Sequence, residues 1–156
     1  MERQRARKTF KYKLMPTPEQ ERTLATVLWR CPELYNAGLQ ERRDAWQQCG
    51  VRITSAGHSA QLPAIKDVQP EYRDIHSQVL QDVLTRLDRA FHAFFRRVKA
   101  GQTPGYPRFH GANRYTSVTN KQFGNGAALD NGLLVLSKIG RVAVRWSRSI
   151  AGPPRP

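Results

Sequence analysis

One long apolar stripe does most to limit the folds that this chain can adopt. Between about residues 75 and 99, apolar side chains recur at steps of three and four residues, the spacing of one helix face. The members of the stripe are Val79, Leu80, Val83, Leu84, Leu87, Ala90, Phe91, Phe94, Phe95 and Val98. A stripe of this width requires apolar partners, so we predict a helical core around a helix over 75–99 that ends at Gly101.

Earlier helices are predicted to supply those partners. Thr17 has the position of an N-cap, Pro18 that of the first helical residue, and apolar residues follow at helical spacing. Pro32 is predicted to end this helix, because a proline inside a helix removes one hydrogen bond and crowds the preceding turn. A second helix is therefore predicted from Pro32 to about Gln48, and a short third one over 59–68.

The character of the sequence changes after Gly101, where glycines and prolines separate short runs of β-prone residues. These runs predict strands at 115–119, 133–136 and 142–146. Near the other end of the chain, residues 9–14 alternate bulky with basic side chains, which predicts a strand with one apolar and one cationic face. Pairing between these distant strands would make the helical block an insertion in a small antiparallel β-sheet or barrel.

The predicted fold class is therefore α+β. We expect residues 1–16 to contribute the first β segment, residues 17–101 to form the helical subdomain, and residues 102–156 to contribute the remaining β segments.

Positive charge is concentrated at the two ends of the sequence. Residues 1–13 carry a net charge of +5, residues 14–95 carry −1, and residues 96–156 carry +10. A near-neutral middle between two cationic arms predicts a polyanionic ligand, and nucleic acid is the most common one. Asp130 is the only acidic residue after Arg96. We therefore predict no nuclease centre, which needs several carboxylates converging on its metal ions.

Several other classes of protein fit the sequence poorly. It contains no run of about 18 apolar residues, and no apolar segment follows the basic N-terminus, so neither a membrane span nor a secretory signal is predicted. Cys31 and Cys49 form no Cys-x-x-Cys pair and are predicted to be reduced core thiols of a cytoplasmic protein. The four histidines have no metal-ligand spacing, so neither a metal nor a cofactor is expected.

Several segments resemble TnpB (OrfB) proteins, which are transposon-encoded, RNA-guided DNA endonucleases related to the type V CRISPR effectors. The resemblance covers roughly residues 8–150, with the segments in the same order and at similar spacing. They are KYKLMPTPEQ at 11–20, Cys31 with Tyr35-Asn36, PAIK at 63–66 with PEY at 70–72, SQVLQDVL at 77–84, LDRAFHAFFR at 87–96, GYPRF at 105–109 and LSKIG at 136–140. Pro32 departs from the family, which usually keeps an unbroken helix there.

The resemblance implies that the helical block corresponds to the recognition lobe of the family and the β segments to its wedge domain. It also implies binding of guide RNA and of a short duplex DNA motif beside the target. Family members continue into a RuvC-like nuclease domain and usually a zinc ribbon, and this chain ends before both. We therefore expect an N-terminal portion that binds without cutting, with guide RNA, duplex DNA and a missing nuclease portion as partners.

Nine basic residues are candidates for contacts to RNA or to phosphates, because Lys and Arg neutralise the charge of the nucleic-acid backbone. They are Arg7, Lys8, Lys11, Lys13, Arg96, Arg97, Lys99, Arg108 and Arg114. The alternatives are a solubility face for the first strand and favourable interaction with the helix dipole for the cations at 96–99. In the segment 106–109, we expect the aromatic rings to pack onto the helices while Arg108 faces the ligand.

Five polar residues are candidates for reading the DNA motif, and the resemblance points to the helix and the later segment that contain them. They are Ser77, Gln78, Gln81, Thr119 and Asn120. A glutamine amide can bond adenine through both of its polar atoms in the major groove, and Gln81 is the strongest candidate. The alternative for each residue is a polar surface position without a ligand.

Two other interpretations of the whole chain stay open. Transposon fragments with helix pairs can bind DNA ends without RNA, which would make this chain an RNA-independent DNA-binding regulator. It could also be a decayed fragment without function. For RNA-guided binding and for the RNA-independent regulator, we expect a cytoplasmic prokaryotic protein that lies on the nucleoid when bound. Competition between structured RNA and duplex DNA separates these two functions, and a cooperative melt argues against a decayed fragment.

Overall fold

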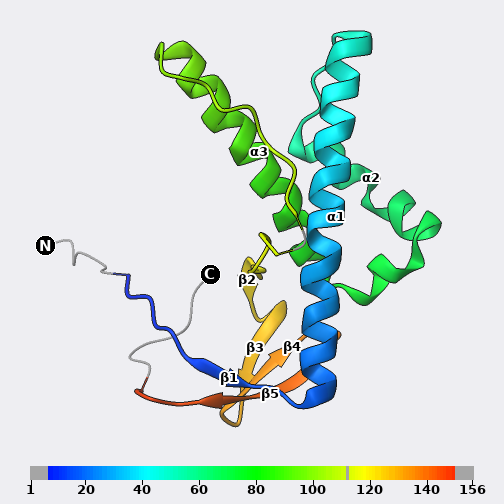
Figure 1. Ribbon diagram of the computed structural model, residues 1–156. Helices are drawn as coiled ribbons and strands as arrows, with labels where there is room; N and C mark the ends of the chain where they lie inside the picture. The colour runs from blue at the N-terminus through cyan, green and yellow to red at the C-terminus, as the bar shows by residue number, and fades with distance from the viewer. Residues whose placement is uncertain (1–6, 112, 150–156) are drawn as a thin grey trace, which may run out of the picture.

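The computed structural model describes residues 7–111 and 113–149, and it consists of a helical block above a small β-sheet (Figure 1). The elements in order are β1 (Lys13–Met15), α1 (Pro18–Cys49), α2 (Ser55–Val68), the 3-10 helix η1 (Pro70–Asp74), α3 (Ser77–Lys99), β2 (Gln122–Phe123), β3 (Gly126–Asp130), β4 (Leu133–Leu136) and β5 (Gly140–Arg145). The predicted α+β class is confirmed, since three helices and a five-stranded sheet make up the described part.

The sheet is open and has the strand order β1-β5-β4-β3-β2. β1 pairs antiparallel with β5, which confirms that the helical block is inserted between paired β segments. β2 pairs parallel with β3, so the sheet is mixed where an all-antiparallel one was expected. Asn131 and Gly132 both have positive φ, and they form the tight turn between β3 and β4 that this dipeptide favours.

Helix α1 is a single helix of 32 residues, so the predicted break at Pro32 is wrong. Its start is as expected, because the Thr17 side chain accepts from the Gln20 backbone amide and the Gln20 side chain accepts from Thr17 in a capping box. Pro32 is itself buried, between Cys31 and Leu34 in the core. Burial on both sides of the proline stabilises the helix enough to offset its missing hydrogen bond.

Other predicted boundaries also need correction. α2 begins four residues earlier than expected because Thr54 caps it, and its hydroxyl accepts from the Gly57 backbone amide. The strand predicted at 9–14 is regular only from Lys13, where β5 supplies a partner. The run at 115–119 is no strand, because Tyr115 leaves the sheet to pack in the helical core. The strand at 133–136 is confirmed, and the one predicted at 142–146 is observed as β5.

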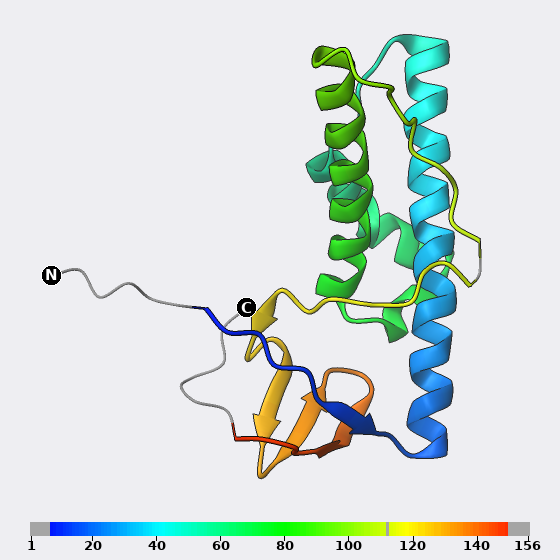
Figure 2. The ribbon, with the colours of Figure 1, turned by 60° about the vertical axis from the view of Figure 1, so that its left-hand side comes forward.

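The core lies between α1 and α3, which lie alongside each other in Figure 2 and diverge toward the end of α3 in Figure 1. Leu39, Leu80 and Leu87 are completely buried there. Gly38 permits the close approach, because a Cβ at this position would lie 2.9 Å from Cδ2 of Leu87. The apolar stripe predicted for α3 therefore organises the helical core as far as Phe91, whereas Phe95 and Val98 at its end are exposed.

The two cysteines have different environments. Cys31 is fully buried, and burial raises the pKa of its thiol to about 12. Cys49 is exposed at the end of α1, so the prediction of a core thiol is wrong for this residue. Both are free thiols. Within the described ranges, no helix combines the length and the apolarity that spanning a membrane requires.

Candidate nucleic-acid interface

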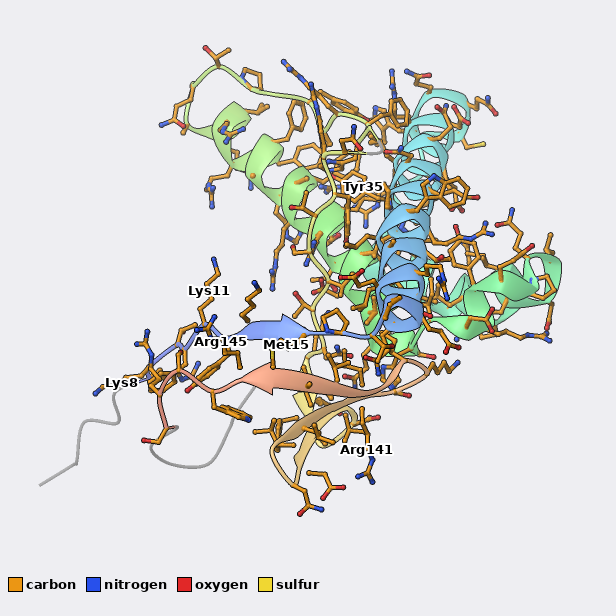
Figure 3. All side chains as sticks on the ribbon, turned by 60° about the horizontal axis from the view of Figure 1, so that its bottom comes forward. Lys8, Lys11, Met15, Tyr35, Arg141 and Arg145 are labelled. Atoms are coloured by element: carbon orange, nitrogen blue, oxygen red, sulfur yellow. The ribbon has the colours of Figure 1, made fainter. Side chains whose placement is uncertain are left out.

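The N-terminal and C-terminal cationic arms meet in the sheet. Lys13 of β1 lies directly opposite Arg145 of β5 in the antiparallel register, and both side chains are exposed. Figure 3 shows Arg145 beside the arm that leads into β1, with Lys11 and Lys8 further along that arm. Residues that lie opposite each other in a sheet point to the same face. We call Lys8, Lys11, Lys13 and Arg145 the sheet-end cations.

The opposition of Lys13 and Arg145 has an electrostatic cost. Like charges directly across a strand pair destabilise it, by a fraction of a kcal/mol up to about 1 kcal/mol. None of the four sheet-end cations forms an ion pair with a carboxylate in the described residues, whereas the nearby Arg141 pairs with Asp130 at 3.0 Å. An anion bound at this face would remove the repulsion.

Aromatic contacts fix the geometry of the two arms. The Tyr12 ring stacks on Phe10 and lies edge-on to Trp146, with centroid distances of 6.4 and 4.9 Å. The Tyr12 hydroxyl donates to the Arg148 carbonyl at 3.0 Å, and the Trp146 Nε1–H donates to the Gly132 carbonyl at 2.9 Å. These contacts hold both arms beside each other beyond the few hydrogen bonds that β1 itself supplies.

A second group of candidate cations lies at the other end of the molecule. Arg96, Arg97 and Lys99 are exposed in the last turn of α3, and Arg108 is exposed on the segment that follows. We call these four residues the tip cations. α3 has 23 residues, which corresponds to about 34 Å along its axis, and its tip points away from the sheet (Figure 1). The structure therefore divides the predicted phosphate-binding residues between two separated ends.

Arg7 and Arg114 complete the nine predicted cations. Arg7 is exposed at the start of the described chain, on the arm of the sheet-end cations. Arg114 is exposed on the segment that returns from the tip, four residues after His110. The Asn36 side chain holds that segment on α1, because it donates to the His110 carbonyl and accepts from the His110 amide.

The structure brings the five predicted motif readers to one place, at the start of α3. The Gln78 side-chain amide donates to the Gln122 side chain at 3.0 Å and accepts from the Gln122 backbone amide at 3.2 Å. Lys121 Nζ donates to the Thr85 hydroxyl at 2.7 Å. The segment 119–122 therefore lies along the first turns of α3, although more than 30 residues separate the two in sequence.

Most of the five predicted readers already have partners within the protein. The Ser77 hydroxyl accepts from Lys66, the Gln78 amide bonds Gln122, and the Thr119 hydroxyl accepts from Arg86. Asn120 Oδ1 is buried without a hydrogen-bond partner in the described residues, so it faces the interior. Gln81 is exposed, and its side-chain amide makes no hydrogen bond to another described residue. Of the five, Gln81 is the residue whose amide is available to a ligand.

Sequence reasoning missed the residue that holds this site together, Arg86. Its Nε donates to Asp82 at 2.8 Å, its Nη1 to the Ser117 carbonyl at 2.9 Å, and its Nη2 to the Thr119 hydroxyl at 3.0 Å. Its guanidinium also covers the Tyr115 ring at 5.0 Å. The available signal was an arginine four residues after an aspartate beside an apolar stripe. Such a pair usually belongs to a solvated helix face, whereas Asp82 is buried here.

Two comparisons show which known proteins this chain resembles. Residues 1–50 match the helix-turn-helix domain model of the OrfB proteins of IS605-type elements. A protein of Streptomyces pristinaespiralis named "Putative RNA-guided DNA endonuclease" is 29% identical over 151 residues. The aligned region covers 94% of this chain and 36% of that protein. This chain is TnpB/OrfB-like. It spans about a third of the length of that relative.

In this TnpB/OrfB-like chain, the residues matched by the domain model do not form two separate helices. From residue 7 onward they comprise β1 and α1, and α1 runs without interruption to Cys49. The described ranges also bring together no group of three or more His, Cys, Asp or Glu side chains that could hold a metal ion.

Proposed function

We propose that this TnpB-like chain binds nucleic acid, holding a guide RNA and a short duplex DNA motif beside the target. The observation that carries the proposal is the direct opposition of Lys13 and Arg145, which come from the two cationic arms of the sequence. A backbone phosphate between these two side chains would turn a repulsive pair into a bridged one. Such contacts position a nucleic acid without reading its sequence.

Base reading is proposed for the start of α3. Gln81 is exposed there, and the segment 119–122 lies beside it with Lys121 as an adjacent cation. Helix-borne amides reach base edges in the major groove, where adenine presents one donor and one acceptor. Gln78, Thr119 and Arg86 then have a supporting role, because their mutual contacts fix the surface around Gln81.

The same proposal assigns parts to the subdomains. The β segments at both ends would act as the wedge-like part that binds phosphates, and the helices of residues 17–101 as the recognition-like part. The chain would bind nucleic acid without cleaving it, since Asp130 is the only acidic residue after Arg96. We expect the chain to bind RNA and DNA in the cytoplasm and to lie on the nucleoid when bound.

The test is a competition experiment with the purified chain. Structured RNA should displace a labelled RNA hairpin better than duplex DNA does, and log affinity should fall with log salt at a slope near −4 if about five phosphates are neutralised. The double substitution Lys13→Gln, Arg145→Gln should make this slope shallower by roughly 1.5 to 2. A matched control, Arg73→Gln with Arg89→Gln, removes the same charge from exposed positions on the helices.

Each result has a defined meaning. A salt slope near zero contradicts phosphate binding altogether. Equal effects of the two double substitutions contradict the assignment to the sheet end. Preference for duplex DNA over structured RNA favours an RNA-independent DNA-binding regulator, the function that the helix-turn-helix description of the matching domain model suggests.

A further inference from the structure

A cavity of about 620 Å³ lies between the end of α1, the segment 51–54 that precedes α2 and the last turns of α3. Pockets for ligands up to drug size measure roughly 300–1,000 Å³, a range that suits a nucleotide. Aromatic rings from three segments line it, namely Trp46, Phe91, Phe94, Phe95 and Tyr106. The motif-reading and sheet-end residues lie elsewhere, so neither part of the proposed function uses this cavity.

Two of the lining rings are largely exposed to solvent. Trp46 is 62% exposed and Tyr106 is 42% exposed, which is unusual for side chains of this size. The Tyr106 ring lies edge-on to Phe94 and Phe91, with centroids at 5.3 and 5.7 Å, so α3 holds it in place. Arg43 lies over the Tyr106 ring at 5.6 Å, so Trp46 is the most exposed of the lining rings and has no arginine over it among the described residues.

The charge at this cavity is positive. Arg52 covers the Phe95 ring at 4.6 Å and Arg42 covers the Phe91 ring at 5.0 Å. Asp88 is the one carboxylate among the lining residues, and Arg42 binds it at 3.0 Å. Arg96 and Arg97 follow directly on Phe95 and form no ion pair in the described residues. The surroundings thus favour an aromatic ligand that carries negative charge.

We infer that this cavity binds an unpaired base of single-stranded RNA, which stacks on Trp46 and the α3 rings while the tip cations hold the flanking phosphates. Aromatic stacking combined with arginine is the usual way in which proteins hold single-stranded bases. An apolar protein segment would also bury the rings, but it would leave the arginines at the rim without anionic partners. The inference rests on the proposed function, because it names the form of RNA that the tip end takes.

The test uses the full chain, a 12-nucleotide oligo-uridine and an RNA duplex of equal length, with binding measured by fluorescence anisotropy. Trp46→Ala should weaken oligo-uridine binding by about 5- to 150-fold, the range for losing one base–aromatic stack. Duplex binding and the salt slope should stay unchanged, because no phosphate contact is lost. Trp29→Ala is the matched control, since Trp29 is 57% exposed on the same helix and outside the cavity.

The outcomes separate this inference from the proposed function. Equal affinities of the Trp46→Ala and Trp29→Ala variants for oligo-uridine overturn the base site, while salt-dependent RNA binding of the unaltered chain preserves the proposed function. Absence of RNA binding by the unaltered chain overturns both. A loss of self-association in Trp46→Ala, measured by sedimentation with oligo-uridine affinity unchanged, assigns the cavity to protein contact and also overturns the inference. Thermal melts of both variants establish that they are folded.

Discussion

The sheet end and the helix tip carry similar positive charge, yet the fold assembles them in different ways. At the sheet end, Lys13 and Arg145 come from opposite ends of the sequence and meet because their strands pair. At the tip, Arg96, Arg97 and Lys99 are neighbours in one helix turn. The first arrangement places like charges opposite each other, whereas the second places them at a helix C-terminus, where the dipole favours cations.

This difference shows that a cation can be costly to the fold or useful to it. Because Lys13 and Arg145 destabilise the protein unless an anion binds, their opposition points to a ligand. Arg96, Arg97 and Lys99 stabilise α3 even when nothing is bound, so their presence alone points to a ligand less strongly. The aromatic cavity beside the tip supplies the separate reason to expect one there.

The largest effect is expected where both ends depend on the same core. Leu87 is completely buried between α1 and α3, so Leu87→Ala should lower the free energy of unfolding by about 2–5 kcal/mol. Urea denaturation followed by circular dichroism measures this. Val98→Ala on the same helix is the control, because Val98 is half exposed and should cost far less. Comparable costs for the two substitutions would contradict a common α1–α3 core.

A smaller effect is expected at the motif-reading surface between the two ends. Gln81→Ala should cost on the order of 1–3 kcal/mol in binding one DNA motif and little for other sequences. Binding to a panel of duplexes measures this, with Gln47→Ala as a control because Gln47 is an exposed glutamine near the tip end of α1. An equal loss on every duplex would make Gln81 a positioning residue instead.

Charge reversal should separate the two ends by the sign of its effect on stability. Lys13→Glu replaces a repulsion with an attraction to Arg145 and should raise the free energy of unfolding by about 0.2–1 kcal/mol. Lys99→Glu puts an anion at the C-terminus of α3 and should lower it by about 0.3–1 kcal/mol. Both should weaken RNA binding. Shifts of the denaturation midpoint in the same direction for both substitutions would contradict this distinction between the ends.

The smallest effect is expected on acidification. His58 is buried against Gly38. Burial and the charge of Arg42 lower the pKa of His58 from 6.5. Glu41, at 3.2 Å, and Asp88 raise this pKa, but their effect is smaller. The unfolded chain therefore takes up this proton first as the pH falls, so stability is complete above about pH 6.5 and declines below it. Burial also lowers the pKa of His110, which adds in the same direction.

Denaturation of the unaltered chain and of His58→Gln at about pH 7.5 and about pH 5.5 measures this decline. The substitution should flatten the pH dependence without removing the part due to His110. An identical pH dependence in the two proteins would contradict the assignment to His58.

Local sequence signals predicted the elements that depend on their own residues. The Thr17 cap, the strand at 133–136 and the α3 stripe as far as Phe91 appear as expected. Each of them rests on side-chain periodicity or on cap chemistry within a few residues. Pairing between the N-terminal strand and the C-terminal β segments was also expected, and β5 is the strand that pairs with β1.

The failures occurred where distant residues compete with a local signal. Pro32 does not end α1, because core packing on both sides of it outweighs the missing hydrogen bond. The run at 115–119 is β-prone, but Tyr115 is buried among the helices and Arg86 binds Ser117 and Thr119, which follow it. Local propensity does not include such contacts, since Arg86 and its partners in 115–119 lie about 30 positions apart in the sequence.

The candidate site shows the same division. The sequence alone determined which residues are available for the site: two cationic arms, a near-neutral helical middle and a few polar side chains at the start of α3. Only the tertiary structure decided that the cations form two separated groups, that Gln81 is free while Gln78 and Thr119 are engaged, and that rings from three segments surround one cavity. The physical reason is that composition and periodicity are properties of neighbours in the chain, whereas charge repulsion, hydrogen-bond partners and cavities depend on distances in space.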